Sequence, residues 1–287
     1  MKRATWMICS LLVLSGCGFE ERVPIEMTSM NQSQPLDKEK KLNSTIRFGI
    51  GSLEITAGDR ESELYSFDLE YDQASYVPEA RYDTALAGEE GRFSFDLPST
   101  RRSGVRRHRN NNRLRLAFNQ SIPLDLTVNA GVGDARLSLS GMKLTRLNFE
   151  AGVGGAKLSV YKPNLVPCEY ISIKNGVGSI EAVGLGNLNF REFEYEGGVG
   201  GADLDFTGEW NRDADIRIQV GVGGVNVKMP REIGVRVEAE KNFLSGVHLD
   251  GFNQRDSAYY STNYDTAAIK ISVRVQTGIG GLKISWL

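Results

Sequence analysis

A short glycine motif, Gly-Val-Gly or Gly-Ile-Gly, recurs through this chain and constrains its fold more than any other feature. The full copies read VNAGVGDARLSL (128–139), FEAGVGGAKLSV (149–160), IKNGVGSIEAVG (173–184), YEGGVGGADLDF (195–206), IQVGVGGVNVKM (218–229) and VQTGIGGLKISW (275–286). A degenerate copy, IRFGIGSLEITA, lies at 46–57, and the first five full copies follow one another at steps of 21, 24, 22 and 23 residues. A fixed period of about 20–50 residues is typical of a stacked solenoid.

Each copy alternates apolar and polar residues after its glycines. In the fourth copy, Ala202, Leu204 and Phe206 share one side of the chain, and Asp203 and Asp205 share the other. This period of two residues is typical of a half-buried β-strand. A second short strand precedes each motif, so the sequence predicts an all-β, single-stranded β-solenoid, similar to a right-handed β-helix, with about 21–24 residues per coil.

The glycines then have a structural role at the corners of the coils. A side chain there would clash with the neighbouring corner, or the backbone would need a positive φ. We expect the aliphatic residue between the glycines to point inward (Val132, Val153, Val177, Val199, Val222 and Ile279). A nucleotide-binding loop is disfavoured, because it needs one glycine site before a helix rather than six before strands. Residues 197–205 match a calcium-binding nonapeptide only in part and only once.

The N-terminus carries a targeting signal. Lys2 and Arg3 precede nine apolar residues (6–14), too few to cross a bilayer about 30 Å thick. The sequence LSGC at 14–17 resembles the bacterial lipobox, which implies a signal peptide over 1–16 and lipidation of Cys17, and residues 17–44 then read as a flexible tether. Gly18 in place of Asp favours the outer membrane if the organism is Gram-negative. Cys168 is the remaining cysteine of the mature chain; it reads as a small, partly buried residue.

Two capping segments complete the expected organisation, because the end of a solenoid is an exposed edge. Residues 45–127 form the N-terminal cap, with a predicted hairpin between 92–97 and 113–118. Residues 128–287 form the solenoid, closed at the far end by Trp286 and Leu287. The loop of the predicted hairpin is rich in arginine, whose guanidinium group binds phosphate and carboxylate in a bidentate manner. We expect it to bind an anionic polymer or lipid of the envelope through Arg101, Arg102, Arg106, Arg107 and Arg109.

Catalytic and metal-binding patterns are scarce. His108 and His248 have no partner at metal-ligand spacing, and no G-x-S-x-G motif is present, so we expect no enzyme, no metal and no cofactor. In stacked coils Glu181 and Asp203 would be neighbours, which leaves a polysaccharide-active β-helix enzyme as an alternative. The formal net charge of −2 disfavours nucleic acid as a partner.

The repeats resemble the toast-rack family, found in the C-terminal domain of LiaF-type proteins of the cell-wall antibiotic response and in adhesin-like proteins. The similarity runs from IPLDL (122–126) through AGVGD (130–134) and LSLSG (137–141) to GIGG (278–281). It implies a non-catalytic β-solenoid that serves as a binding or assembly module. It leaves open a protein partner, self-association, or an accessory role in an envelope-stress response.

Overall fold

The computed structural model describes residues 25–100, 111–240 and 245–287. Within them the chain forms strands joined by short loops and two 3₁₀ turns, Leu86–Gly88 and Leu185–Leu188. The predicted signal peptide and Cys17 lie outside the described residues.

Each repeat contributes one strand before its glycine corner and one after it. The strands before the corner are β2 (Lys41–Ile50), β8 (Pro123–Val132), β10 (Lys143–Val153), β12 (Cys168–Val177) and β14 (Phe190–Val199). Those after it are β3 (Ser52–Ala57), β9 (Ala135–Ser138), β11 (Ala156–Ser159), β13 (Ile180–Val183) and β15 (Ala202–Asp205). The long strands β16 (Ala214–Met229) and β21 (Lys270–Trp286) run through the corner without a break.

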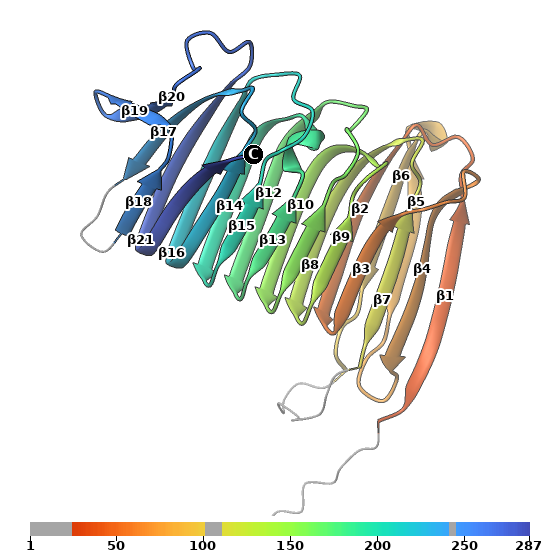
Figure 1. The fold of residues 1–287 in the computed structure, drawn as a ribbon. Helices are drawn as coiled ribbons and strands as arrows, with labels where there is room; N and C mark the ends of the chain where they lie inside the picture. Colours follow the sequence, from red (N-terminus) through yellow and green to blue (C-terminus); the bar gives the residue numbers. More distant parts are fainter. Residues whose placement is uncertain (1–24, 101–110, 241–244) are drawn as a thin grey trace, which may run out of the picture.

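The strands stack in parallel and in register, so equivalent residues of successive repeats lie side by side. Val153 pairs with Val177, Val177 with Val199, and Val199 with Val222. The stack is elongated, with a first face of strands before the corner and a second face of strands after it (Figure 1). The predicted all-β solenoid is confirmed.

The core lies between the two faces and follows the predicted alternation. Ala202, Leu204 and Phe206 are at most 2% exposed, whereas Asp203 is exposed. Buried aromatic rings fill one cross-section, where Phe206 packs edge-on against Phe193 at a centroid distance of 5.0 Å. Period-2 burial therefore accounts for this part of the interior, whereas Leu185 and Leu188 of the second 3₁₀ turn are buried without it.

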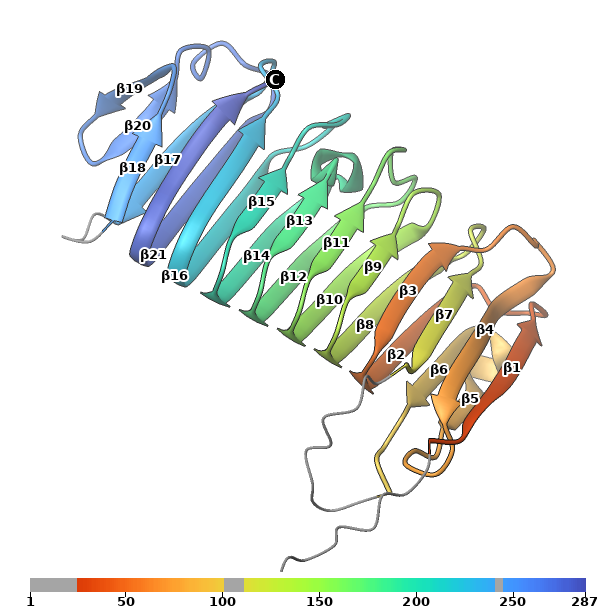
Figure 2. The same ribbon diagram turned by 60° about the horizontal axis from the view of Figure 1, so that its bottom comes forward.

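The first coils do not follow chain order. The strands β6 (Glu90–Asp96) and β7 (Arg113–Phe118) pair in parallel with β2 and β3, so residues 41–57 stack between this coil and the coil of β8 and β9 (Figure 2). The predicted hairpin between 92–97 and 113–118 is therefore wrong. Both segments have the apolar alternation of a hairpin arm, but the same alternation suits two strands on opposite faces of one coil.

Antiparallel strands cap this end: β1 (Met27–Pro35), β4 (Glu63–Asp72) and β5 (Glu79–Ala85). Every residue of β1 pairs with β4, and β2 begins at Lys41. The prediction of a flexible tether over 17–44 is therefore wrong for residues 27–35 and 41–44, which form strands. Strand β1 lies at the edge and buries no side chain fully. Its sequence therefore lacks the apolar alternation that marks the other strands.

The opposite end departs from chain order as well. Strand β21 inserts between β16 and the pair formed by β17 (Gly234–Glu240) and β18 (Ser245–Leu249). Beyond them lie β19 (Phe252–Arg255) and β20 (Ala258–Ser261). Trp286 and Leu287 thus do not close the stack as expected. Instead Trp286 stacks on Phe252 and donates a hydrogen bond to the carbonyl oxygen of Asp250.

Candidate binding surface along the stacked corners

Two glycine columns leave no room for side chains at the corners. A Cβ on Gly152 would lie 2.4 Å from the carbonyl oxygen of Gly131. A Cβ on Gly154, which has a φ of +141°, would lie 1.9 Å from the carbonyl oxygen of Gly133. Both approaches are closer than any real contact, so the predicted structural role of these glycines is confirmed. The next position is open, since nothing lies within 4 Å of a Cβ on Gly201.

The aliphatic residues between these glycines point outward, so the prediction that they face the core is wrong. Their exposed fractions run from 43% to 52% (Val132, Val153, Val177, Val199, Val222 and Ile279). The two faces converge at the corner, where small residues such as Ala151 and Ala156 already fill the interior. The chain bends there, and strand alternation no longer decides the direction of the side chain. We call these six residues the corner ridge.

A groove runs beside the corner on the first face. Its volume is about 770 Å³, and it crosses five coils, from β10 through β12, β14 and β16 to β21. Corner glycines form part of its lining, and a column of polar side chains lies along it (Glu150, Lys174, Glu196, Gln219 and Gln276). Lys174 binds Glu196 at 2.8 Å, and this hydrogen bond raises the pKa of the lysine. The groove repeats the same positions coil after coil rather than bringing groups together at one point.

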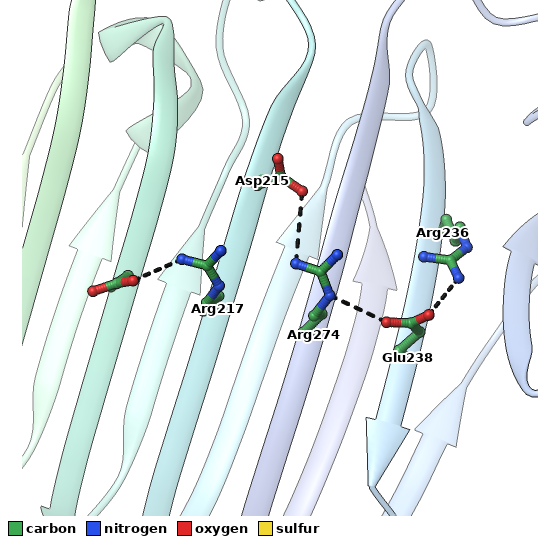
Figure 3. Close-up of polar contacts among 6 residues, drawn as sticks. Asp215, Arg217, Arg236, Glu238 and Arg274 are labelled. Carbon is green, nitrogen blue, oxygen red and sulfur yellow. Dashed lines mark hydrogen bonds and ion pairs between the residues drawn. The ribbon is translucent and has the colours of Figure 1, made fainter.

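A network of ion pairs covers the C-terminal part of the first face (Figure 3). Arg274 lies between Asp215 (4.0 Å) and Glu238 (3.2 Å), and Glu238 also binds Arg236. The hydrogen bond from Arg236 lowers the pKa of Glu238. These side chains are partly exposed to solvent, so the ion pairs contribute little to the free energy of unfolding.

The predicted pair of carboxylates is present but is engaged with other groups. Glu181 and Asp203 occupy equivalent positions on β13 and β15. Glu181 accepts a hydrogen bond from Lys157 at 2.9 Å, and Asp203 accepts one from Asn226 at 2.7 Å. Half of the Glu181 side chain is exposed, so it lacks the apolar enclosure typical of a general acid. The pair is therefore part of a charge ladder on the second face.

Cys168, predicted to be a small and partly buried residue, is fully buried in β12. Burial raises the pKa of its thiol to about 12, so the thiol is neutral and inaccessible at physiological pH. His248 pairs with Asp250 at 3.2 Å on the surface. The described residues contain no cluster of three or more His, Cys, Asp or Glu side chains able to hold a metal ion. In the same part of the chain no helix has the length and apolarity needed to span a membrane.

The predicted anion-binding arginines (Arg101, Arg102, Arg106, Arg107 and Arg109) lie outside the described residues, as does His108. The neighbouring Arg113 and Arg115 are exposed on β7, and Arg115 lies 3.6 Å from Glu54. Asn111 and Arg113 line a pocket together with Met27, the first residue of β1. Asn111, the first described residue after the arginine segment, therefore lies near the start of β1.

Comparison with known proteins gives one family match. The sequence model described as the N-terminal domain of toast_rack (DUF2154) matches residues 24–183 and 170–228. A search of curated proteins finds no match.

Solved structures that match this chain share little sequence with it. A proposed cell adhesion protein from Clostridium sporogenes is 20% identical, with coverage of 91% of this chain and all of the other, and a TM-score of 0.47. A proposed adhesin from Bacteroides fragilis is 11% identical, with coverage of 90% and 97% and a TM-score of 0.41.

Proposed function

This chain belongs to the toast-rack family, and from that premise we propose that it is a non-enzymatic binding or assembly module of the cell envelope, anchored through a lipid on Cys17. One observation supports the module most directly. The groove crosses five coils and presents a polar side chain at the equivalent position of each coil. Because strands stack about 4.8 Å apart, such a surface suits an extended or repeating partner. Catalysis needs groups that converge on one reacting bond.

The lipid anchor rests on the LSGC sequence at 14–17 and on the position of β1. Met27 begins β1 only ten residues after Cys17. Ten residues reach at most about 36 Å when fully extended. An anchored chain would therefore keep the N-terminal end of the solenoid close to the membrane. The outer membrane remains our expectation if the organism is Gram-negative.

An anionic lipid surface is the partner that we propose for the arginine segment. Its end at Asn111 lies in the same pocket as Met27, so anchoring at Cys17 would bring these arginines near lipid headgroups. A basic segment adds to the membrane affinity of an acyl chain, and guanidinium groups bind phosphate in a bidentate manner.

The test uses the purified full-length chain with Cys17→Ser and vesicles containing phosphatidylglycerol. We expect co-sedimentation at low salt that weakens as salt rises, because the attraction is screened over about 8 Å at physiological ionic strength. Replacing Arg101, Arg102, Arg106 and Arg107 by Ser should reduce binding several-fold without lowering the melting temperature. Replacing Arg191, Arg212, Arg217 and Arg231 by Ser is the charge-matched control, because these four arginines lie in or next to β14 and β16, far along the stack. Equal sedimentation of both variants and the parent would contradict the role of the segment.

A further inference from the structure

We infer that the corner ridge is a self-association surface that packs against the ridge of a second copy of this chain, in antiparallel orientation. The inference deepens the proposed binding or assembly role and rests on it, but it does not depend on the lipid at Cys17. Four observations carry it: the apolarity of the ridge, its flanking glycines, its repeat and the charges beside it.

The apolarity of the ridge is not explained by the fold. The described part of the chain exposes thirteen large apolar side chains, and six of them are the ridge residues. A β-branched residue suits an extended corner, but Thr is β-branched too and would suit water better. The corners of the six full repeats nevertheless all carry Val or Ile, each about half exposed. A contiguous apolar row of this kind marks an interaction surface.

The glycines beside the ridge give it a complementary shape. Gly152 and Gly154 flank Val153, and Gly176 and Gly178 flank Val177. Because stacking forbids a Cβ at these positions, the ridge stands between two furrows that no side chain can fill. A second ridge can therefore approach closely, with its aliphatic side chains packed against those of the first and no side chain on the flanking glycines in the way. The surface is thus self-complementary, as a two-fold contact requires.

The regular spacing of the ridge residues favours a second copy of this chain as the partner. Successive ridge residues pair in register between neighbouring strands, so they recur about every 4.8 Å. A second copy of this chain presents aliphatic groups at that same spacing and matches the ridge at every coil. A lipid bilayer is a poorer partner, because the charged side chains of Glu150 and Lys174 lie beside the ridge and would have to leave water.

The charges set the orientation. Glu150, Lys174 and Glu196 follow one another along the groove, with alternating sign. In a parallel two-fold arrangement the axis runs along the stack and places the groove of one copy beside the second face of the other, so the two charged columns do not meet. In an antiparallel arrangement the two columns face each other, and with the two-fold axis between β12 and either β10 or β14, Lys174 of one copy faces Glu150 or Glu196 of the other.

The test places single cysteines in the full-length chain and treats membranes of expressing cells with a short thiol-specific cross-linker. We expect the highest dimer yield at Val177→Cys and at its neighbours Val153→Cys and Val199→Cys, with a decline towards Val132→Cys and Ile279→Cys. Leu165→Cys is the matched control. It is 79% exposed, but it lies in the loop between β11 and β12, at the other end of the strands. Native Cys168 is buried and does not compete.

A dimer yield at Val177→Cys at least five-fold above that of Leu165→Cys, with this decline, supports the inference. A flat profile, or a yield no higher than that of Leu165→Cys, overturns it. The proposed membrane module would still stand in that case if Cys17→Ser releases the chain from the same membranes.

A second measurement tests the same contact without introducing cysteine. In sedimentation of the Cys17→Ser chain, the triple change Val153→Thr, Val177→Thr and Val199→Thr should raise the dimer dissociation constant at least ten-fold. The melting temperature should not change, because Thr keeps the shape of Val on an exposed corner. An unchanged dissociation constant, or a parent chain that is monomeric at 100 µM, overturns the inference.

Discussion

At the scale of single residues, the corners distinguish glycines that the fold requires from glycines that it merely tolerates. Gly154 combines a positive φ with a contact against the backbone of the preceding coil. Gly201, two residues after the corner valine of its own coil, has no neighbour within 4 Å of an added Cβ. In the equivalent position other coils carry Asp134 and Ser179, which confirms that a side chain fits there.

Gly154→Val should therefore lower the free energy of unfolding by at least about 1–3 kcal/mol, the usual cost of backbone strain alone. Gly200→Val should behave in the same way, because its added Cβ would lie 1.7 Å from the carbonyl oxygen of Gly178. Gly201→Ala is the control and should leave stability unchanged or slightly higher. Urea unfolding of the three variants measures these differences. Equal midpoints for Gly154→Val and Gly201→Ala would show that the corners are looser than described.

Cys168 offers a second residue-scale prediction, made for the chain with Cys9→Ser and Cys17→Ser. The pKa of the buried thiol is raised to about 12, so the folded protein should not react with a thiol reagent at pH 8. The unfolded thiol, with a pKa near 8.5, should react readily. This difference contributes stability below the unfolded pKa, and that contribution is lost as the pH rises from about 9 towards 12. Labelling rates with and without guanidinium test this, and fast labelling of the folded chain would contradict it.

At the scale of elements, β21 contributes more to the fold than its terminal position in the sequence indicates. It pairs with β16 along its length and with β17 and β18 on its other side. Neither β17 nor β18 pairs with β16, so β21 joins the last coil to the rest of the solenoid. Stability in such arrays is a sum of contacts between neighbouring coils.

A chain that ends at residue 268 should consequently lose structure well before its own C-terminus. Strands β17–β20 would lack their parallel partner, and their amides should exchange at rates near those of an unfolded chain. The coils from β8 to β15 should keep their protection, because their neighbours remain. Hydrogen exchange followed by mass spectrometry measures the protection of β8–β15 and of β17–β20 in one sample. Protected amides in β17 of the truncated chain would mean that β17 can pair directly with β16.

At the scale of the whole molecule, the solenoid is a rod that has a different chemistry at each level. The N-terminal end carries the antiparallel cap and the pocket shared by Met27 and Asn111. The groove and most of the corner ridge run from the middle of the rod to β21, and the ion-pair network lies farther from the corner on the C-terminal coils. This order suits a protein held at its N-terminal end, with its long faces available to partners.

Cys17→Ser should release the protein from membranes or leave its precursor unprocessed. Several acyl chains bind a bilayer tightly, because each buried CH₂ contributes about 0.8 kcal/mol. Fractionation of cells and the mass of the mature chain measure this outcome, with Cys168→Ser as the control that should stay in the membrane. An unchanged mass and an unchanged partition of Cys17→Ser would refute lipidation.

Features that depend on local contacts could be predicted from the sequence. Alternation with a period of two residues identified the buried side chains of each coil. The repeated glycines identified the corners, because no other residue fits where the backbones of stacked corners touch. The pairing of strand edges, in contrast, depends on the packing of the whole chain. Residues 41–57 and β21 insert between coils that are adjacent in the sequence, and β1 forms an edge strand without an apolar signal. The outward direction of Val153 also depended on the tertiary structure, because it follows from the convergence of the two faces at the corner rather than from any property of the residue.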